Sequence, residues 1–366
     1  MIAGLLRDLA SVQASTQSKW GYKRAAAAIM NLDVPIETLR HTDGTFEKIA
    51  NVGPASTRVI DEVLTTGGSP LVDTAVSAAG KSAEITQRRL WQRHFLSRAQ
   101  VLATLGATLP GVISREECRA DFQMHSMWSD GGDSLQELAE GCLSRGYTHC
   151  VITDHSHGLR IARGMSADEV GGQHAEIDGL NDHYAGRFRI IKGIEANIQR
   201  DGTLDVSLDD LEPIELVMAA PHAALRLETD QTARMLATVA HPRINILGHG
   251  RGRMFGSRPG VSADWRQVFL AAAANGVAIE IDGDPSRQDV DYTLAREALS
   301  CGCVIALSSD AHGASQLRYI DNAIAHARLA EIPTDRVINS WSVERLLSWC
   351  AGSVAQRVGR IDAAGL

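Results

Sequence analysis

Histidines and acidic residues directly follow a series of short apolar runs in this sequence. They are His125, Asp154, His155, Glu195, His222, His249, Asp310 and His312. Imidazole nitrogens and carboxylate oxygens are the ligand types that bind zinc, manganese or iron in hydrolytic sites. A single histidine of this kind more often belongs to an ordinary core or helix end. The recurrence at equivalent places along the chain favours a metal site.

The stretch 121–131 opens this series. It reads Asp-Phe-Gln-Met-His-Ser-Met-Trp-Ser-Asp-Gly, with Gln123 two residues before His125 and Asp130 five residues after it. The run follows a short apolar start, which is typical of a ligand-bearing loop at the mouth of a barrel.

The apolar runs that precede these residues predict buried parallel strands. They lie at residues 150–153, 189–194, 216–220, 244–248, 277–281 and 304–309, and all but the run at 277–281 end in a ligand type. Helical patterns lie between them, at 135–144 and at 167–181, the latter behind a Ser166-x-x-Glu169 capping box. Strand–helix alternation over the 248 residues 119–366 predicts a (β/α) barrel, which typically has ~250 residues. In a barrel the carboxyl ends of all strands open on one face, so the candidate ligands are expected to converge.

The N-terminal part predicts a small helical domain. Residues 1–40 have helical spacing of apolar residues, and Pro35 ends the pattern. Residues 46–64 predict a short helix, a tight turn around Gly53 and a second helix that ends at Gly67. The turn amides would suit a phosphate oxygen, so Val52, Gly53 and Ala55 are candidate DNA contacts. A plain helical corner is the alternative.

Residues 76–118 are expected to be a helical linker between a domain at 1–75 and a barrel domain at 119–366. The pattern over 84–105 is helical, with arginines on one face. A solvated spacer helix and a direct nucleic-acid contact both fit this pattern.

Charge and cysteine content bound the remaining possibilities. The net charge is −8, but residues 1–120 hold 14 basic and 11 acidic residues, so the excess of acid lies in the barrel. Six cysteines form no CxxC pair, and we expect them to be reduced. No apolar run is long enough for a membrane span, and the first ten residues include Arg7 and Asp8. We therefore expect a cytoplasmic protein.

These motifs resemble the polymerase and histidinol phosphatase (PHP) domain, in the form carried by bacterial family X DNA polymerases. The segments that carry the resemblance are Met124-His125-Ser126-Met127-Trp128-Ser129-Asp130-Gly131, Ile152-Thr153-Asp154-His155-Ser156, Gly193-Ile194-Glu195, Gly202-Thr203-Leu204-Asp205 and Ser309-Asp310-Ala311-His312. The resemblance covers 121–350, and residues 1–68 are similar to the helix-hairpin-helix domain of the same polymerases. It implies an α/β fold, a distorted (β/α)7-type TIM-like barrel preceded by a small all-α domain.

The resemblance also implies two or three divalent ions, of manganese, zinc or iron. One set of ligands would be Gln123, His125, Glu195 and Asp310; a second Glu195, His222 and His249; a third Asp130, His155 and His312. Glu195, Asp310 and His155 would be catalytic through the ions that they hold. Asp154 would orient His155 or another ligand.

Gln123 departs from the pattern, because the family normally has histidine there. A neutral amide oxygen is a weaker ligand than imidazole, so the first set is expected to bind its ion less well. The polymerase palm and fingers are also missing, because residues 69–118 are too short to hold them. Val59 stands where related lyase domains carry a Schiff-base lysine, so neither polymerase nor lyase activity is expected.

Substrate contacts are expected from arginines near the ligands. Arg160 and Arg253 match arginines of the family and could bind phosphate oxygens. Arg163, Arg251 and Arg258 fit a solvated loop equally well.

Three hypotheses on function follow. The first is a metal-dependent phosphoesterase that acts on DNA, as a 3′–5′ exonuclease or in 3′-end processing, with DNA as its partner. The second is a small-molecule phosphatase of the histidinol-phosphate type. The third is a DNA-binding scaffold whose weakened cluster no longer turns over.

Overall fold

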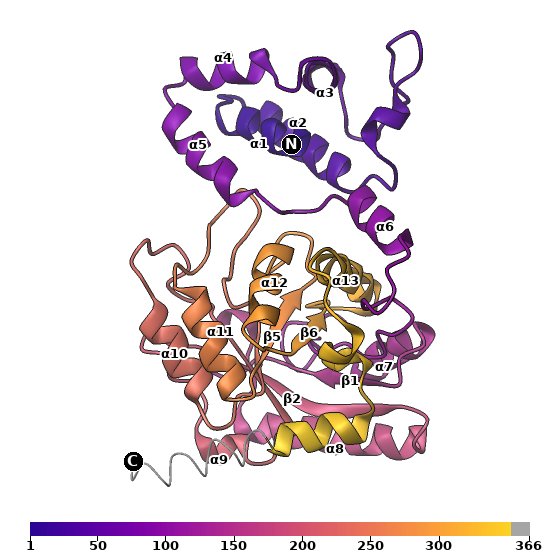
Figure 1. The fold of residues 1–366 in the computed structure, drawn as a ribbon, viewed down its shortest axis with the longest axis vertical. Coiled ribbons are helices and arrows are strands. Elements are labelled where there is room, and N and C mark those ends of the chain that lie inside the picture. The colour runs from indigo at the N-terminus through magenta and orange to yellow at the C-terminus, as the bar shows by residue number, and fades with distance from the viewer. Residues whose placement is uncertain (353–366) are drawn as a thin grey trace. The chain divides into compact units, whose positions relative to one another are not determined.

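The computed structural model describes residues 1–352 and divides the chain into two units (Figure 1). The first comprises residues 1–107 together with 254–258, and the second comprises residues 108–253 and the chain from Pro259 onward. Each unit has its own apolar core.

The second unit is built on a parallel sheet whose six named strands follow one another in chain order. The strands are β1 (His149–Ile152), β2 (Arg189–Asn197), β3 (Leu216–Ala220), β4 (Ile246–Leu247), β5 (Ala278–Asp282) and β6 (Ile305–Ser308). Each pairs in parallel with the next, and every predicted strand from 150 onward is thereby confirmed. The α/β class and the barrel-like sheet agree with the sequence prediction.

The segment 121–125 lies between the two edges of this sheet. Its backbone accepts hydrogen bonds from Val151 and Thr153 at β1, and Met124 forms a parallel bridge with Ala311 just beyond β6. A seventh extended segment therefore joins the first and last strands, in keeping with the expected distorted seven-part barrel.

Helices connect the strands and pack on the outside of the sheet (Figure 1). They are α7 (Leu135–Ser144), α8 (Ala167–Tyr184), α9 (Leu208–Leu211), α10 (Thr232–Ala240), α11 (Trp265–Ala274), α12 (Tyr292–Ser300) and α13 (Ile320–Leu329). The 3-10 turns are η2 (Arg160–Ala162), η3 (Ala314–Tyr319), η4 (Thr334–Arg336) and η5 (Ile338–Ser340), and residues 343–352 are also helical. The predicted capping box of Ser166 and Glu169 opens α8, and Ser134 with Glu137 opens α7 in the same way.

The first unit is all-helical. Its elements are α1 (Ile2–Ser11), α2 (Thr16–Met30), η1 (Ile36–Leu39), α3 (Pro54–Thr66), α4 (Pro70–Ala78), α5 (Ser82–Trp91) and α6 (Arg98–Gly106). Leu6, Val59, Val72 and Ile85, from four of these helices, share one buried cluster. Residues 76–107 are thus part of this unit.

Two local predictions in the first unit are wrong. The expected helix at residues 46–51 is absent: Arg40 and Phe46 form an antiparallel bridge, and a turn leads into α3. Only the second helix of the expected hairpin exists, with Gly53 as its N-cap and Gly67 in the left-handed region at its end. The single helix expected over 84–105 is interrupted at residues 92–97, because Ser97 caps a new helix there.

The predicted basic face of the helices at 84–105 is largely neutralised within the unit. Arg88 and Arg89 pair with Asp8, whose side chain is fully buried, and Arg98 pairs with Asp33. These arginines hold α5 and α6 against the first helices, so they leave less free charge for a nucleic acid than the sequence indicates.

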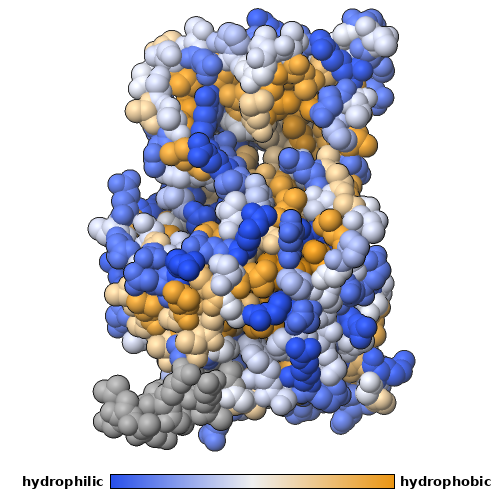
Figure 2. Space-filling view, in the orientation of Figure 1, coloured by the Kyte–Doolittle hydropathy of each residue, from blue (hydrophilic) through white to orange (hydrophobic). Residues whose placement is uncertain are grey.

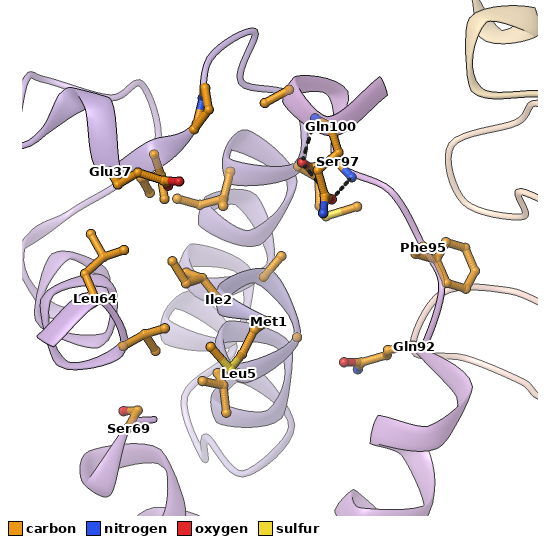
Figure 3. A pocket seen from close by; sticks show the side chains of 18 of the residues that line it. Met1, Ile2, Leu5, Glu37, Leu64, Ser69, Gln92, Phe95, Ser97 and Gln100 are labelled. Atoms are coloured by element: carbon orange, nitrogen blue, oxygen red, sulfur yellow. Dashed lines mark hydrogen bonds between the residues drawn. The ribbon is translucent and has the colours of Figure 1, made fainter. Parts of the chain in front are cut away.

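A cavity of about 970 Å³ lies within the first unit (Figure 3). Ile2, Leu5, Leu64 and Phe95 line it with apolar surface, and Gln92 extends toward it from the end of α5. Apolar side chains also reach the surface of this unit in the space-filling view (Figure 2).

No helix within residues 1–352 is both long and apolar enough to cross a membrane.

His149, at the start of β1, makes the stability of the second unit pH-dependent. The ring is fully buried, its Nε2 has no hydrogen bond, and burial lowers the pKa of His149 from 6.5 to about 4. The unfolded chain therefore takes up a proton below pH 6.5 that the folded chain binds only near pH 4, so stability is present above 6.5 and is lost as the pH falls. We expect His149→Gln to reduce the loss of unfolding free energy between pH 7 and 4.5 by about 2 kcal/mol, at ~1.4 kcal/mol per pKa unit. Urea unfolding at both pH values measures this difference.

The exposed His183 supplies the control, because His183→Gln should follow the pH dependence of the unchanged chain. Parallel stability curves for His149→Gln and the unchanged chain would contradict the prediction.

Candidate metal centre

Glu195 is the centre of a cluster of histidines at the carboxyl end of the sheet. It lies near the end of β2 and is 1% exposed. Its Oε1 is 2.9 Å from His249 Nε2 and 3.4 Å from His222 Nε2, and its Oε2 is 3.3 Å from His125 Nε2 and 3.4 Å from His155 Nδ1. Four imidazoles thus surround one carboxylate.

Asp310 approaches the same cluster from the loop after β6. Its Oδ1 is 3.2 Å from His125 Nε2, so His125 lies between Asp310 and Glu195. The φ angle of Asp310 is 54°, in the left-handed region that non-glycine residues rarely adopt. Residues held in such conformations are concentrated at functional sites, where the surrounding structure fixes them.

Asp130, His155 and His312 form the outer part of the cluster. Asp130 Oδ1 is 3.6 Å from His155 Nε2 and 3.5 Å from His312 Nε2. The His125 ring stacks on His155, with centroids 4.3 Å apart. Together with His125 these three residues could hold a metal ion, as could His155, Glu195 and His222.

Two histidines of the cluster are oriented by a hydrogen bond on their other ring nitrogen. His222 Nδ1 lies 3.2 Å from Asn197 Oδ1, and His312 Nδ1 lies 2.9 Å from the carbonyl of Asp310. Such bonds fix the ring and leave Nε2 free for a ligand. In both histidines Nε2 is the nitrogen that faces a carboxylate of the cluster.

The donor set fits divalent ions. Both carboxylate oxygens of Glu195 and both ring nitrogens of His125 and His249 are buried and make no hydrogen bond. Buried polar atoms without partners are costly. Bound ions would satisfy both Glu195 oxygens and the Nε2 atoms of His125 and His249 that face them. Neutral imidazoles mixed with carboxylates suit zinc, manganese or iron.

The electrostatics of the cluster keep its carboxylates ionised. Burial would raise the pKa of Glu195, but His155, His222 and His249 hold it well below its usual value. The pKa of Asp310 is likewise lowered, by Arg287 and His125 against the effect of burial. Burial lowers the pKa of His155. Burial would also lower the pKa of His125 and of His312, but Asp310 and Glu195 raise that of His125, and Asp130 and Asp310 raise that of His312 to about 9. An ion that binds through these two rings would therefore displace protons.

Asp154 fixes the loop that carries Asp130. Its carboxylate is fully buried and accepts hydrogen bonds from the Ser126 amide at 2.8 Å, the Ser126 hydroxyl at 2.6 Å, the Ser129 hydroxyl at 2.5 Å and the Gln173 amide at 2.6 Å. The loop is also tight at Gly131, where a Cβ would lie 2.1 Å from the His125 carbonyl oxygen. Asp154 is thus a positioning residue for the loop between His125 and Asp130.

Gln123 is buried, and neither its amide oxygen nor its amide nitrogen makes a hydrogen bond. Met124 Sδ lies 3.7 Å from Cys142 Sγ of α7, on the outside of the sheet. His125 points toward Glu195 and Asp310. The role of Gln123 as a ligand stays a prediction.

The two arginines predicted to bind substrate have different surroundings. Arg253 is 2% exposed, and its guanidinium binds Asp291 and the backbone carbonyls of Arg287 and Gln288. Arg253 lies in the loop after β4, and through these bonds it holds the loop after β5 in place. A phosphate contact does not fit its burial. Arg160 is exposed at the start of η2, in the loop that follows His155, and is accessible to substrate.

Sequence reasoning missed three charged residues beside the cluster, all from β5 and the loop behind it. Glu280 and Asp282 are fully buried, and burial raises the pKa of both carboxyls well above the usual value. Arg287 Nη2 lies 3.3 Å from Asp310 Oδ2, and its Nε lies 3.9 Å from Asp282 Oδ2. The only signal in the sequence was that the strand at 277–281 ends in Asp282-Gly283-Asp284.

The chain is similar to proteins whose names refer to phosphoester chemistry. It is 33% identical over 234 residues to the DNA polymerase/3′-5′ exonuclease PolX of Bacillus subtilis, which covers 64% of this chain and 41% of PolX. It is 30% identical over 160 residues to a probable phosphatase of Shewanella oneidensis, which covers 41% of this chain and 61% of the phosphatase. The chain is homologous to these proteins, which confirms the resemblance predicted from its motifs.

The chain thus spans less than two thirds of the length of these relatives. No family model matches it. The histidinol phosphate phosphatase of Lactococcus lactis, solved with zinc, L-histidinol and phosphate, aligns with a TM-score of 0.40 and 14% identity over 66% of this chain and 94% of that one. A TM-score of this size carries no information about the function of the chain.

Asp154→Ala should weaken metal binding without unfolding the barrel. The change leaves Ser126, Ser129 and Gln173 without their acceptor, so the loop that carries Asp130 is no longer fixed. Losing an outer partner of this kind typically costs about 10- to 100-fold in metal affinity. Isothermal titration with Mn²⁺ measures the loss, and circular dichroism reports on the fold.

The exposed Asp43, which accepts two hydrogen bonds from Thr45 in the first unit, provides the matched control. Asp43→Ala should leave Mn²⁺ affinity unchanged. Equal affinities for Asp154→Ala and the unchanged chain would contradict the role of Asp154.

Proposed function

We propose that the chain is a divalent-metal-dependent phosphoesterase that acts on DNA ends, as a 3′–5′ exonuclease or a related 3′-end-processing enzyme. The observation that carries the proposal is the buried Glu195 carboxylate within 3.4 Å of four imidazole nitrogens, with Asp130 and Asp310 at its sides. A cluster of this composition is suited to hydrolysis of a phosphoester.

Divalent ions bound there would supply a water of lowered pKa and positive charge for the phosphoryl oxygens. The residues of the chain do the positioning. Glu195 would hold ions together with the histidines that its two oxygens face, and Asp310 would hold one together with His125. Asn197 keeps the His222 ring in place, and Asp154 keeps Asp130 in place through the loop. Arg160 in η2 is the arginine proposed to contact the phosphate.

DNA is the proposed substrate because the chain is homologous to PolX over 64% of its length, and PolX is named as a 3′-5′ exonuclease. The turn before α3 supports the same substrate, because Gly53 and Ala55 lie at the N-terminus of a helix, where the first amides have no partner within the helix. The amide of Val52 donates to the Ile49 carbonyl at 3.2 Å. Nucleotide transfer is not part of the proposal, because residues 69–118 are too short for a polymerase core.

A small-molecule phosphatase is the second candidate. It is favoured by the probable phosphatase of Shewanella oneidensis, with which the chain shares 30% identity. The outer part of the cluster supports it as well, since His312 and Asp130 are partly exposed and a small ester could reach them.

His222→Ala and Asp310→Ala test the metal centre directly. Each removes a group that contacts Glu195 or His125, so we expect a loss of hydrolysis of more than about 100-fold with the barrel intact. The assay uses Mn²⁺ with 3′-labelled DNA and, in parallel, with histidinol phosphate. Full activity in either variant would remove the proposed site, and His183→Ala, an exposed histidine on α8, should remain fully active.

The same assay separates the hypotheses. Release of nucleotides from DNA supports the exonuclease, and hydrolysis of histidinol phosphate alone supports the phosphatase. Salt-sensitive DNA binding without hydrolysis of either substrate would instead identify a scaffold.

Ala55→Glu tests the turn before α3. The new carboxylate would repel a phosphate at this spot, whereas a negative charge in the first turn of a helix favours the fold. We expect DNA affinity to fall about tenfold, which corresponds to ~1.4 kcal/mol, in fluorescence anisotropy. Hydrolysis of a small phosphate ester should not change.

Ser82→Glu is the matched control, because Ser82 is exposed in the first turn of α5 and the net charge changes equally. A loss of DNA affinity that is the same in both variants would show that only total charge matters.

A further inference from the structure

Arg287 reaches the metal centre from the loop after β5. Its Nη2 lies 3.3 Å from Asp310 Oδ2 and its Nε lies 3.9 Å from Asp282 Oδ2, and neither carboxylate is more than 3% exposed. One side of the guanidinium therefore faces two buried carboxyl groups. Asp310 uses its other oxygen toward His125, so it lies between a fixed cation and an imidazole of the cluster.

The ligands around Asp310 are weaker than elsewhere in the cluster. Gln123 offers a neutral amide oxygen where the resemblance calls for imidazole. It is buried and makes no hydrogen bond. Of the four residues expected to hold the first ion, His125 alone supplies an imidazole.

The two other parts of the cluster have complete sets. Asp130 lies beside His155 and His312, and Glu195 lies beside His222 and His249, so no residue is counted in both sets. Both sets have at least two imidazoles and a carboxylate, the combination that divalent transition metals bind well.

We propose that Arg287 takes the place of one of the three ions, so that this chain holds two ions and balances Asp310 with a guanidinium. The inference rests on the proposed metal centre. A guanidinium is suited to this role because it is always protonated and binds carboxylates through a planar fork of donors. Its fixed charge also repels a third ion at Asp310, which the loss of an imidazole at Gln123 has already weakened.

The variant Gln123→His tests whether the charge of Arg287 or the missing imidazole keeps the third ion out. If Arg287 keeps the third ion out, restoring the imidazole alone should leave the count at two ions per chain. Metal content is measured by inductively coupled plasma mass spectrometry after loading the full chain with Mn²⁺ and removing free metal. Three ions in Gln123→His, or in the unchanged chain, would overturn the proposal.

The double variant Gln123→His/Arg287→Gln should hold three ions, because both obstacles are removed. A count that stays at two in the folded double variant would also overturn the proposal. Arg145→Gln is the matched control: Arg145 Nη2 lies 3.3 Å from Asp321 Oδ1 and its side chain is 24% exposed, against 3.3 Å and 21% for Arg287. Its count should stay at two.

Thermal unfolding gives a second readout that does not depend on activity. In EDTA, Arg287→Gln should melt below Arg145→Gln, because the buried Asp310 carboxylate loses its cation. An Arg287→Gln variant that melts with Arg145→Gln in EDTA would contradict the inference. An unchanged chain that binds no ion at all would overturn the proposed function instead, so the two failures can be distinguished.

Discussion

A buried negative charge must be compensated where it lies, and Glu195 imposes this requirement on the second unit. Its carboxylate is 1% exposed near the end of β2, and four imidazoles converge on it from different parts of the chain. Imidazole rings satisfy such a charge only in part. The remaining imbalance makes this end of the barrel attractive to cations, and the arrangement of the surrounding loops follows from it.

The strands and most of the cluster could be predicted from the sequence because both follow from local patterns. A buried parallel strand appears in the sequence as an apolar run. A polar residue just past its carboxyl end lies at the open face of the barrel. His222 and His249 follow this rule beyond β3 and β4, and Glu195 lies within the last residues of β2. The structure places His222 Nε2 3.4 Å and His249 Nε2 2.9 Å from Glu195 Oε1. Their roles as ligands remain predictions that metal analysis can test.

The remaining features depend on how far a long side chain extends and on which of several partners it contacts. The spacing of residues in the sequence determines neither. Arg287 and Arg253 both lie in loops that follow a strand, yet one faces Asp310 and the other is enclosed by Asp291 and backbone carbonyls. Long flexible side chains can reach several partners, so spacing alone does not choose between them. Residues 46–51 have helical character, but the pairing of Arg40 with Phe46 takes the chain into an extended path.

The extended segment at 121–125, which joins β1 to the end of β6, links folding to metal uptake. His125 and Asp310 are 185 positions apart in sequence and become neighbours only when this segment closes the sheet. Contacts of such long range form slowly, because the entropy of a large loop is lost before they are made. An ion bound at His125 and Asp310 would therefore stabilise the closed barrel by mass action, to an extent set by the free metal concentration.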